Sequence, residues 1–124
     1  KPFIETKDIE YLGNLGDVRE VLNGCRYYVL PSYREGTPRS ILEAMATGRP
    51  IITTNSTGCK ETVIDGVNGL LIPIKDKKSL AKAFQKMLEF NEEKINHMAN
   101  ESLKLVREKY DVKKVNQNIL QIIN

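Results

Sequence analysis

The sequence predicts an α/β fold with a parallel sheet and a helical C-terminal tail. Short apolar runs typical of buried strands alternate with helix-like segments in the first part of the chain. From Ser79 onward the apolar residues recur with the helical period of about 3.6. The length of 124 residues suits one domain, and no internal repeat or low-complexity linker interrupts the chain.

The N-terminal part contains two predicted strands separated by a short helix. Ile9–Leu12 has the pattern of a strand that ends in the turn Gly13–Asn14. Asp17 and Glu20 have the spacing of a capping box, so a short helix is expected to begin there. Tyr27–Leu30 is an apolar run that stops at a proline, which is typical of a buried parallel strand.

A polar loop over Ser32–Thr37 leads into a helix that is well marked at both ends. Thr37 can cap this helix, and Pro38 suits its first position, where the missing N–H costs nothing. Gly48 lies just beyond the last turn, where a left-handed residue commonly ends a helix.

Two further strands are predicted after this helix. Ile51–Thr54 is rich in β-branched residues and is followed by the loop Asn55–Gly58. Cys59–Ile64 is ambiguous, and one short helix is the expectation there. Asp65–Gly69 is a strong turn signal, and Leu70–Pro73 is predicted as the last strand.

The C-terminal tail is predicted to form helices with distinct apolar faces. The expected faces are Leu80, Phe84, Met87 and Leu88 in a first helix, Ile95, Met98, Leu105 and Val106 in a second, and Val112, Val115, Ile119 and Ile122 in a third that Asp111 caps.

Composition excludes several classes of function. The net charge of +3 comes from 19 basic and 16 acidic residues that are interspersed, so no polybasic tract argues for nucleic acid. This excess suits a solvated surface or a small anionic ligand. Cys25, Cys59 and the single His97 cannot build a typical structural zinc site, and two reduced cytosolic thiols are expected. No apolar run approaches the roughly 20 residues that cross a bilayer.

The loop that enters the helix near Pro38 has the features of an anion site. Such a loop leaves the carboxyl end of a strand, where open α/β sheets bind ligands. Gly36 lets the backbone approach a ligand closely, and the helix start offers the unpaired N–H groups of Arg39, Ser40 and Ile41. The guanidinium of Arg39 can add charge-assisted hydrogen bonds to a phosphate.

Two carboxylates flank this predicted anion site. Glu35 comes just before it, and Glu43 points away from the apolar face of the helix. Carboxylates bind phosphate poorly but accept hydrogen bonds from hydroxyl groups, so a sugar on one side and a ribose on the other would suit them. That combination describes a sugar nucleotide. A solvated glutamate on a polar helix face explains the same residues, and without further information it is the commoner case.

The longer pattern around these residues resembles one family. Glu35 and Glu43 stand in the E-x7-E spacing of the retaining GT-B glycosyltransferases, especially glycosyltransferase family 4. The similarity extends from Ile9 to Leu88. The stretches that carry it are Val29–Gly36, Leu42–Ile52, Gly58–Glu61 and Asp65–Leu71.

The resemblance implies a Rossmann-like parallel sheet of about four strands with flanking helices, as part of a GT-B fold. It also implies roles for individual residues. Glu35, the candidate catalytic residue, would contact hydroxyls of the transferred sugar, with the N–H groups of Gly36 and Thr37 beside it. Glu43 would hold the ribose hydroxyls. The other residues implied in substrate binding are Pro38, Arg39, Ser40 and Ile41 toward the diphosphate and Gly13 and Asn14 near the nucleobase.

The implied reaction is transfer of a hexose, with retention, from a UDP-, GDP- or ADP-sugar. The acceptor would be a glycan or a lipid-linked sugar, in polysaccharide, lipopolysaccharide or glycolipid synthesis. No cofactor or metal is expected, and no residue would act as a conventional general base. The location is expected to be cytoplasmic, or peripheral to a membrane in a longer protein. The alternatives left open are a non-catalytic sugar-nucleotide or phosphate-binding module and an interaction domain.

The resemblance further implies that residues 1–124 are a partial C-terminal, nucleotide-sugar-binding domain, truncated on its N-terminal side. The first two strands of the family's sheet, its basic diphosphate grip and its N-terminal acceptor domain would lie elsewhere. The chain alone would then be inactive. Its exposed sheet edges predict one of two outcomes. Either the Ile9–Leu12 strand pairs directly with Tyr27–Leu30, or another copy completes the sheet as a homo-oligomer.

Overall fold

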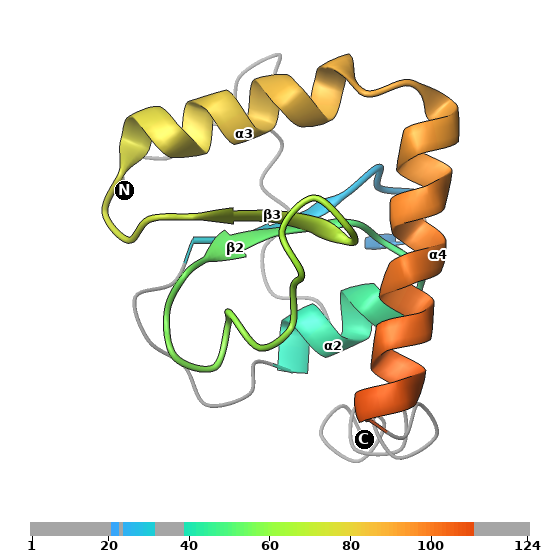
Figure 1. The fold of residues 1–124 in the computed structure, drawn as a ribbon. Helices are drawn as coiled ribbons and strands as arrows, with labels where there is room; N and C mark the ends of the chain where they lie inside the picture. Colours follow the sequence, from blue (N-terminus) through green and yellow to red (C-terminus); the bar gives the residue numbers. More distant parts are fainter. Residues whose placement is uncertain (1–20, 23, 32–38, 111–124) are drawn as a thin grey trace.

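The computed structural model of the chain describes residues 21–22, 24–31 and 39–110. This part is an α/β structure, as predicted (Figure 1). Its elements are β1 (Tyr28–Leu30), α2 (Arg39–Ala46), β2 (Ile51–Thr54), β3 (Gly69–Ile72), α3 (Lys77–Glu89) and α4 (Glu92–Lys109). The predicted strand at Ile9–Leu12, the helix cap at Asp17 and the third tail helix lie outside the described residues.

The sheet has the order β1-β2-β3, and both pairings are parallel. Tyr28 lies opposite Ile51, and Ile51 lies opposite Gly69, so the three strands begin level with one another. Their carboxyl ends therefore meet at one edge of the sheet. Of the roughly four strands expected, the described residues contain three.

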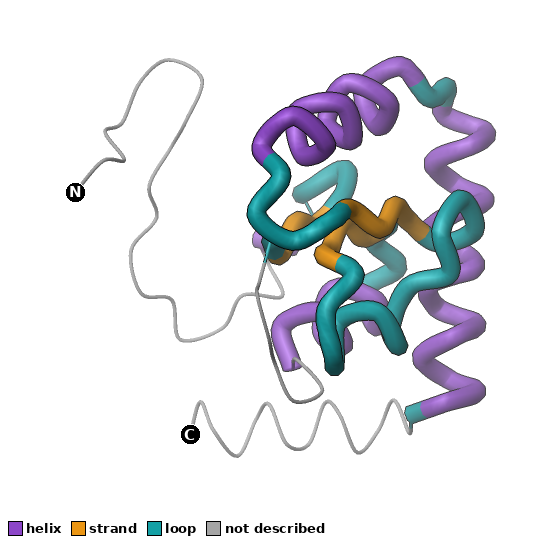
Figure 2. The backbone as a smooth tube through the Cα atoms, turned by 60° about the vertical axis from the view of Figure 1, so that its left-hand side comes forward, coloured by secondary structure: helices purple, strands orange, loops and turns teal. Residues whose placement is uncertain are grey.

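Helices cover both faces of this sheet. Figure 1 shows α3 over one face and α2 under the other, and the strands lie between helices in Figure 2 as well. The strand side chains alternate between the two layers. Ile51 belongs to a fully buried cluster with Ile41 and Met45 of α2, whereas Ile52 joins Met87 of α3 in a second cluster.

Helix α4 contributes to both clusters. Its first half places Ile95 and Met98 in the cluster under α3, and its second half places Leu105 and Val106 in the cluster around α2. The predicted apolar face of this helix is confirmed, because all four side chains are buried. Helix α4 thus runs along one side of the sheet and packs into the core on both of its faces (Figure 1).

The predicted face of α3 is wrong in part. Met87 is fully buried, but Phe84 is 36% and Leu88 67% exposed. The stripe that reaches the sheet is instead Leu80, Ala83 and Met87. Successive helical residues are about 100° apart, so Leu88 is turned well away from a sheet that Met87 faces. A narrow sheet of short strands leaves that flank uncovered within the described residues.

The predicted short helix at Cys59–Ile64 is also wrong, because Cys59–Thr62 form turns and the next two residues belong to no helix or strand. Both the N–H and the hydroxyl of Thr62 donate to the carbonyl of Cys59, at 3.0 and 2.6 Å. The N–H of Ile64 donates to the side-chain oxygen of Asn68 at 2.8 Å. Side-chain hydrogen bonds of this kind compete with the helical pattern for the same backbone groups.

The turn predicted at Asp65–Gly69 is confirmed and is anchored by a buried amide. Gly66 has a φ of +81°. Asn68 is fully buried, and its side chain accepts from Ile64 and donates to the carbonyl of Thr62 at 3.2 Å. The Asn68 carbonyl accepts the N–H of Ile51 at 3.0 Å, which aligns the turn with β2.

The two outer edges of the sheet differ. On β3, the N–H of Leu71 donates to the Asp65 carboxylate at 2.9 Å, and the carbonyl of Gly69 accepts from Gly66 at 2.8 Å. The Asp65–Gly69 turn thus covers this edge with its own polar groups. On the other side, β1 has a strand partner only in β2 among the described residues. The pairing expected for this strand, with Ile9–Leu12 or with another copy, stays a prediction.

We predict that Gly69→Ala destabilises the fold by about 3 kcal/mol or more, because the added methyl group would overlap backbone atoms of β2 that have little room to move. A Cβ at this position would lie 1.8 Å from the carbonyl oxygen of Ile51. Gly66→Ala is the matched control, since nothing lies within 4 Å of its Cβ. It should cost only the roughly 1–2 kcal/mol of a left-handed residue. Urea unfolding of both variants measures the difference, and equal losses would contradict the close approach.

The neighbouring residues Met87 and Leu88 provide a second test. Met87→Ala should lower the free energy of unfolding by about 2–5 kcal/mol, because it leaves a cavity under α3. Leu88→Ala should change the free energy by less than about 0.5 kcal/mol, since its side chain is mostly exposed. Thermal unfolding of the two variants distinguishes this orientation of α3 from one in which both residues face the core.

Candidate functional site

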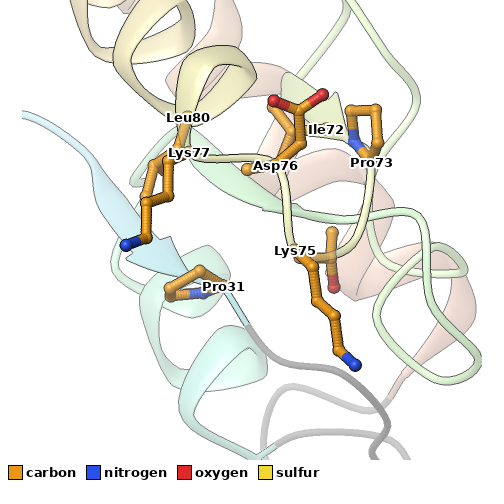
Figure 3. A pocket seen from close by; sticks show the side chains of 8 residues that line it. Pro31, Ile72, Pro73, Lys75, Asp76, Lys77 and Leu80 are labelled. Carbon is orange, nitrogen blue, oxygen red and sulfur yellow. The ribbon is translucent and has the colours of Figure 1, made fainter.

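A cavity of about 250 Å³ opens at the carboxyl ends of all three strands (Figure 3). Pro31 follows β1, Thr54 ends β2 and Ile72 ends β3, and all three line the cavity. Lys75, in the segment between β3 and α3, and Lys77, the first residue of α3, add two amines. This is the edge at which open parallel sheets bind their ligands. The cavity therefore combines apolar walls with cationic groups.

The sequence did not single out Lys75 or Lys77, because both belong to an ordinary-looking lysine-rich segment. Lys75 has a φ of +58°, an uncommon conformation for a residue other than glycine. This turn brings the chain from β3 into α3. In the sequence, only Pro73 and Asp76 marked this segment as a turn before a helix, and neither residue indicated a cavity.

Asp76 lies between the two lysines and caps α3. Its carboxylate accepts the N–H of Ser79 at 2.9 Å and the Ser79 hydroxyl at 2.8 Å. The backbone hydrogen bond from Ser79 is the main cause that lowers the pKa of Asp76 below its ordinary value, with the hydroxyl adding to it. The negative charge is thus committed to the helix cap.

The predicted anion site begins at α2, and the described part of it lies at the start of that helix. Arg39 is exposed, Ser40 is half-buried and the Ile41 side chain is fully buried, so Ile41 can offer a ligand only its backbone. Glu43 is half-buried and lies four residues after Arg39, which places both on one side of the helix. The remaining predicted site residues, Gly13, Asn14, Glu35, Gly36, Thr37 and Pro38, lie outside the described residues.

The loop after β2, Asn55–Glu61, lies beside the start of α2 (Figures 1 and 2). The Cys59 side chain in this loop is fully buried in the same cluster as Ile41. Its thiol packs in the core, so it is not a candidate for chemistry. Gly58 has a φ of +89°, and its N–H donates to the Glu61 carboxylate at 2.8 Å.

Other titratable residues lie away from this edge. His97 is on α4 near Glu101, at 4.0 Å, and is mostly exposed, as its sequence context indicated. Burial raises the pKa of Tyr27, with the charge of Arg26 opposing the effect. Within the described residues no group of three or more His, Cys, Asp or Glu side chains is arranged to hold a metal ion. None of the described helices is long and apolar enough to span a membrane.

Comparison with protein families gives one match over most of the chain. Residues 3–89 match the family described as "Glycosyl transferases group 1". The matched range includes the start of α2, the loop after β2 and the cavity at the strand ends. It also includes every predicted site residue.

Two curated relatives act on diphosphate-linked lipids according to their names. The chain is 36% identical over 98 residues to the N,N'-diacetylbacillosaminyl-diphospho-undecaprenol alpha-1,3-N-acetylgalactosaminyltransferase of Campylobacter jejuni, covering 79% of this chain and 26% of that protein. It is 38% identical over 77 residues to the UDP-Gal:alpha-D-GlcNAc-diphosphoundecaprenol alpha-1,3-galactosyltransferase of Escherichia coli, covering 62% and 20%. The chain therefore spans about a fifth to a quarter of these relatives.

Solved structures share the fold. Anabaena HepE, in complex with UDP and glucose, is 25% identical with a TM-score of 0.77 over 94% of this chain and 32% of that protein. Its similarity agrees with the α/β arrangement of a parallel sheet between helices. The fold predicted from sequence is thus confirmed by GT-B structures.

The Asp76 cap at the cavity gives a test that needs no ligand. Because the pKa of Asp76 is lower in the folded state than in the unfolded chain, its stabilisation is present above its ordinary value of 3.8 and is lost as the pH falls through the folded value. Asp76→Ala should therefore be less stable than the wild type at neutral pH, and the difference should become smaller in acid, where the charge-dependent part of the cap is lost. Asp76→Asn keeps a capping acceptor without a charge, so its stability difference from Asp76→Ala should not depend on pH. Urea unfolding at several pH values measures both.

Proposed function

The chain belongs to the group 1 glycosyltransferases, and from that membership we propose that it is the donor-binding part of a retaining enzyme of glycosyltransferase family 4. The enzyme would transfer a hexose from a nucleotide-diphosphate sugar to a glycan or lipid-linked acceptor. The observation that carries this proposal is the family match over residues 3–89, which includes the helix start at the carboxyl edge of the sheet.

The diphosphate is proposed to bind at the start of α2. The first N–H groups of a helix lack partners within it and carry partial positive charge. Arg39 is exposed there and adds a guanidinium suited to phosphate oxygens. The relative HepE was solved with UDP, which is a ligand of this chemistry.

Glu43 is proposed to bind the ribose hydroxyls. It is half-buried and lies one turn after Arg39, so a ligand whose phosphates meet the helix start can extend along the same side. A carboxylate accepts two hydrogen bonds from neighbouring hydroxyls. Glu35 would meet the transferred sugar as the catalytic contact, with Gly36, Thr37 and Pro38 beside it and with Gly13 and Asn14 near the base.

Catalysis would rest on positioning and on neutralising the leaving diphosphate. No side chain of this chain is assigned as a general base, and no metal or other cofactor is part of the proposal. The names of both relatives specify an alpha linkage, which supports retention. The same names supply the acceptor class, a sugar on a lipid diphosphate, and so support a cytoplasmic enzyme that works at a membrane surface.

The experiment is a titration of the chain with UDP, GDP and ADP, followed by the amide NMR signals of Arg39, Ser40 and Ile41. One nucleotide should shift these signals, and Glu43→Ala should weaken its binding about tenfold, the equivalent of about 1.4 kcal/mol. Glu93→Ala, an exposed glutamate on α4, is the control and should bind like the wild type.

Two results would contradict the proposal. If Glu43→Ala binds as well as the wild type, Glu43 is not in the site. If no nucleotide shifts the α2 signals at millimolar concentration, the chain is better explained as an interaction domain.

A further inference from the structure

We propose that Glu61 is a positioning residue for the nucleotide donor: it fixes the Asn55–Glu61 loop as a wall of the site beside α2. This inference rests on the proposed function. Glu61 does not touch the ligand in this account. It acts through the backbone of Gly58, and the loop it fixes presents the exposed side chains of Asn55 and Thr57.

The position of the loop gives it access to the site. It leaves the carboxyl end of β2, the strand between the two others. Thr54, the last residue of β2, lines the cavity at that edge, and the N–H of Asn55 donates to the Ile72 carbonyl at 2.8 Å. Cys59 in the same loop is buried with Ile41 of α2. The loop thus lies between the cavity and the helix that is proposed to bind the diphosphate.

Most of the loop is anchored without Glu61. Thr54 and Ser56 share a buried hydroxyl–hydroxyl hydrogen bond of 2.8 Å. The N–H of Lys60 donates to the Ser56 carbonyl at 2.9 Å, and Cys59 lies in the core. These anchors hold both ends of the loop. These anchors do not fix the tip of the loop, which consists of the exposed Thr57 and the half-buried Gly58.

The Glu61 carboxylate holds that tip. Its solvent-exposed hydrogen bond to the Gly58 N–H joins an anionic acceptor to a backbone donor, and a charged acceptor strengthens such a bond relative to a neutral one. Gly58 adopts a φ of +89°. A glycine that no contact restrains can adopt many other backbone conformations, so this one has to be fixed. Helix α4 also holds the backbone of Glu61, because Lys109 Nζ donates a hydrogen bond to the Glu61 carbonyl at 3.0 Å.

A carboxylate near a phosphate site would normally repel the ligand. Here a carboxylate oxygen of Glu61 accepts a hydrogen bond from the Gly58 N–H, so the negative charge of Glu61 restricts the loop backbone. Removing the side chain should therefore release the tip without removing the anchors of the fold. The two roles, positioning and stability, can be separated because they depend on different contacts.

The test uses the complete chain, UDP as the probe, and the variants Glu61→Ala and Glu61→Gln. Glu61→Ala should weaken UDP binding about tenfold, while its melting temperature stays close to that of the wild type. Glu61→Gln retains a side-chain oxygen for the Gly58 N–H, so it should restore binding to within about threefold of the wild type. Glu93→Ala again serves as the control, and the amide signals of Thr57 and Gly58 should shift when UDP binds to the wild type.

The outcomes separate this inference from the function on which it rests. If Glu43→Ala weakens UDP binding but Glu61→Ala does not, the donor site stands and the role of Glu61 is overturned. The role is also overturned if Glu61→Gln binds as weakly as Glu61→Ala, because the hydrogen bond to Gly58 would then be irrelevant. If no nucleotide binds the wild type, the proposed function itself fails.

Discussion

The close approach of β3 to β2 at Gly69 is the constraint on which the described structure depends. Only a residue without a side chain fits against the carbonyl of Ile51, and the buried amide of Asn68 holds the preceding turn in place. Together they fix the register of the two strands. Since a slip of one residue would exchange the faces of β3, this contact also decides which side chains enter each core cluster.

The same register creates the candidate site. Because the three parallel strands are in step, the segments that follow them emerge at one edge: Pro31 after β1, Thr54 at the end of β2 and Ile72 at the end of β3. Helix α4 then keeps the helical layers on either side of the sheet in a fixed relation. A ligand at this edge would therefore meet groups whose spacing is set by the core.

The charges around this edge follow a common pattern. Asp76 and Glu61 each accept a hydrogen bond from a backbone N–H, at Ser79 and Gly58 respectively. Their negative charge is thereby committed to holding turns and a helix cap. Lys75 and Lys77 line the cavity, and Arg39 is exposed at the start of α2. The positive groups at this edge suit the anionic diphosphate that we propose as the ligand.

The sequence by itself determined the α/β class, the position of β2 at Ile51–Thr54 and the apolar face of α4, because local periodicity and turn residues specify these features. It also indicated the family, through the spacing of Glu35 and Glu43 and the residues around them. Only the tertiary structure decided that Leu88 faces away from the sheet, that Phe84 is only partly covered, and that Cys59–Thr62 forms turns. It likewise revealed the cavity with Lys75 and Lys77, and the contact of Glu61 with Gly58. These features depend on which surfaces and hydrogen-bonding groups neighbouring elements supply, and local sequence patterns do not contain that information.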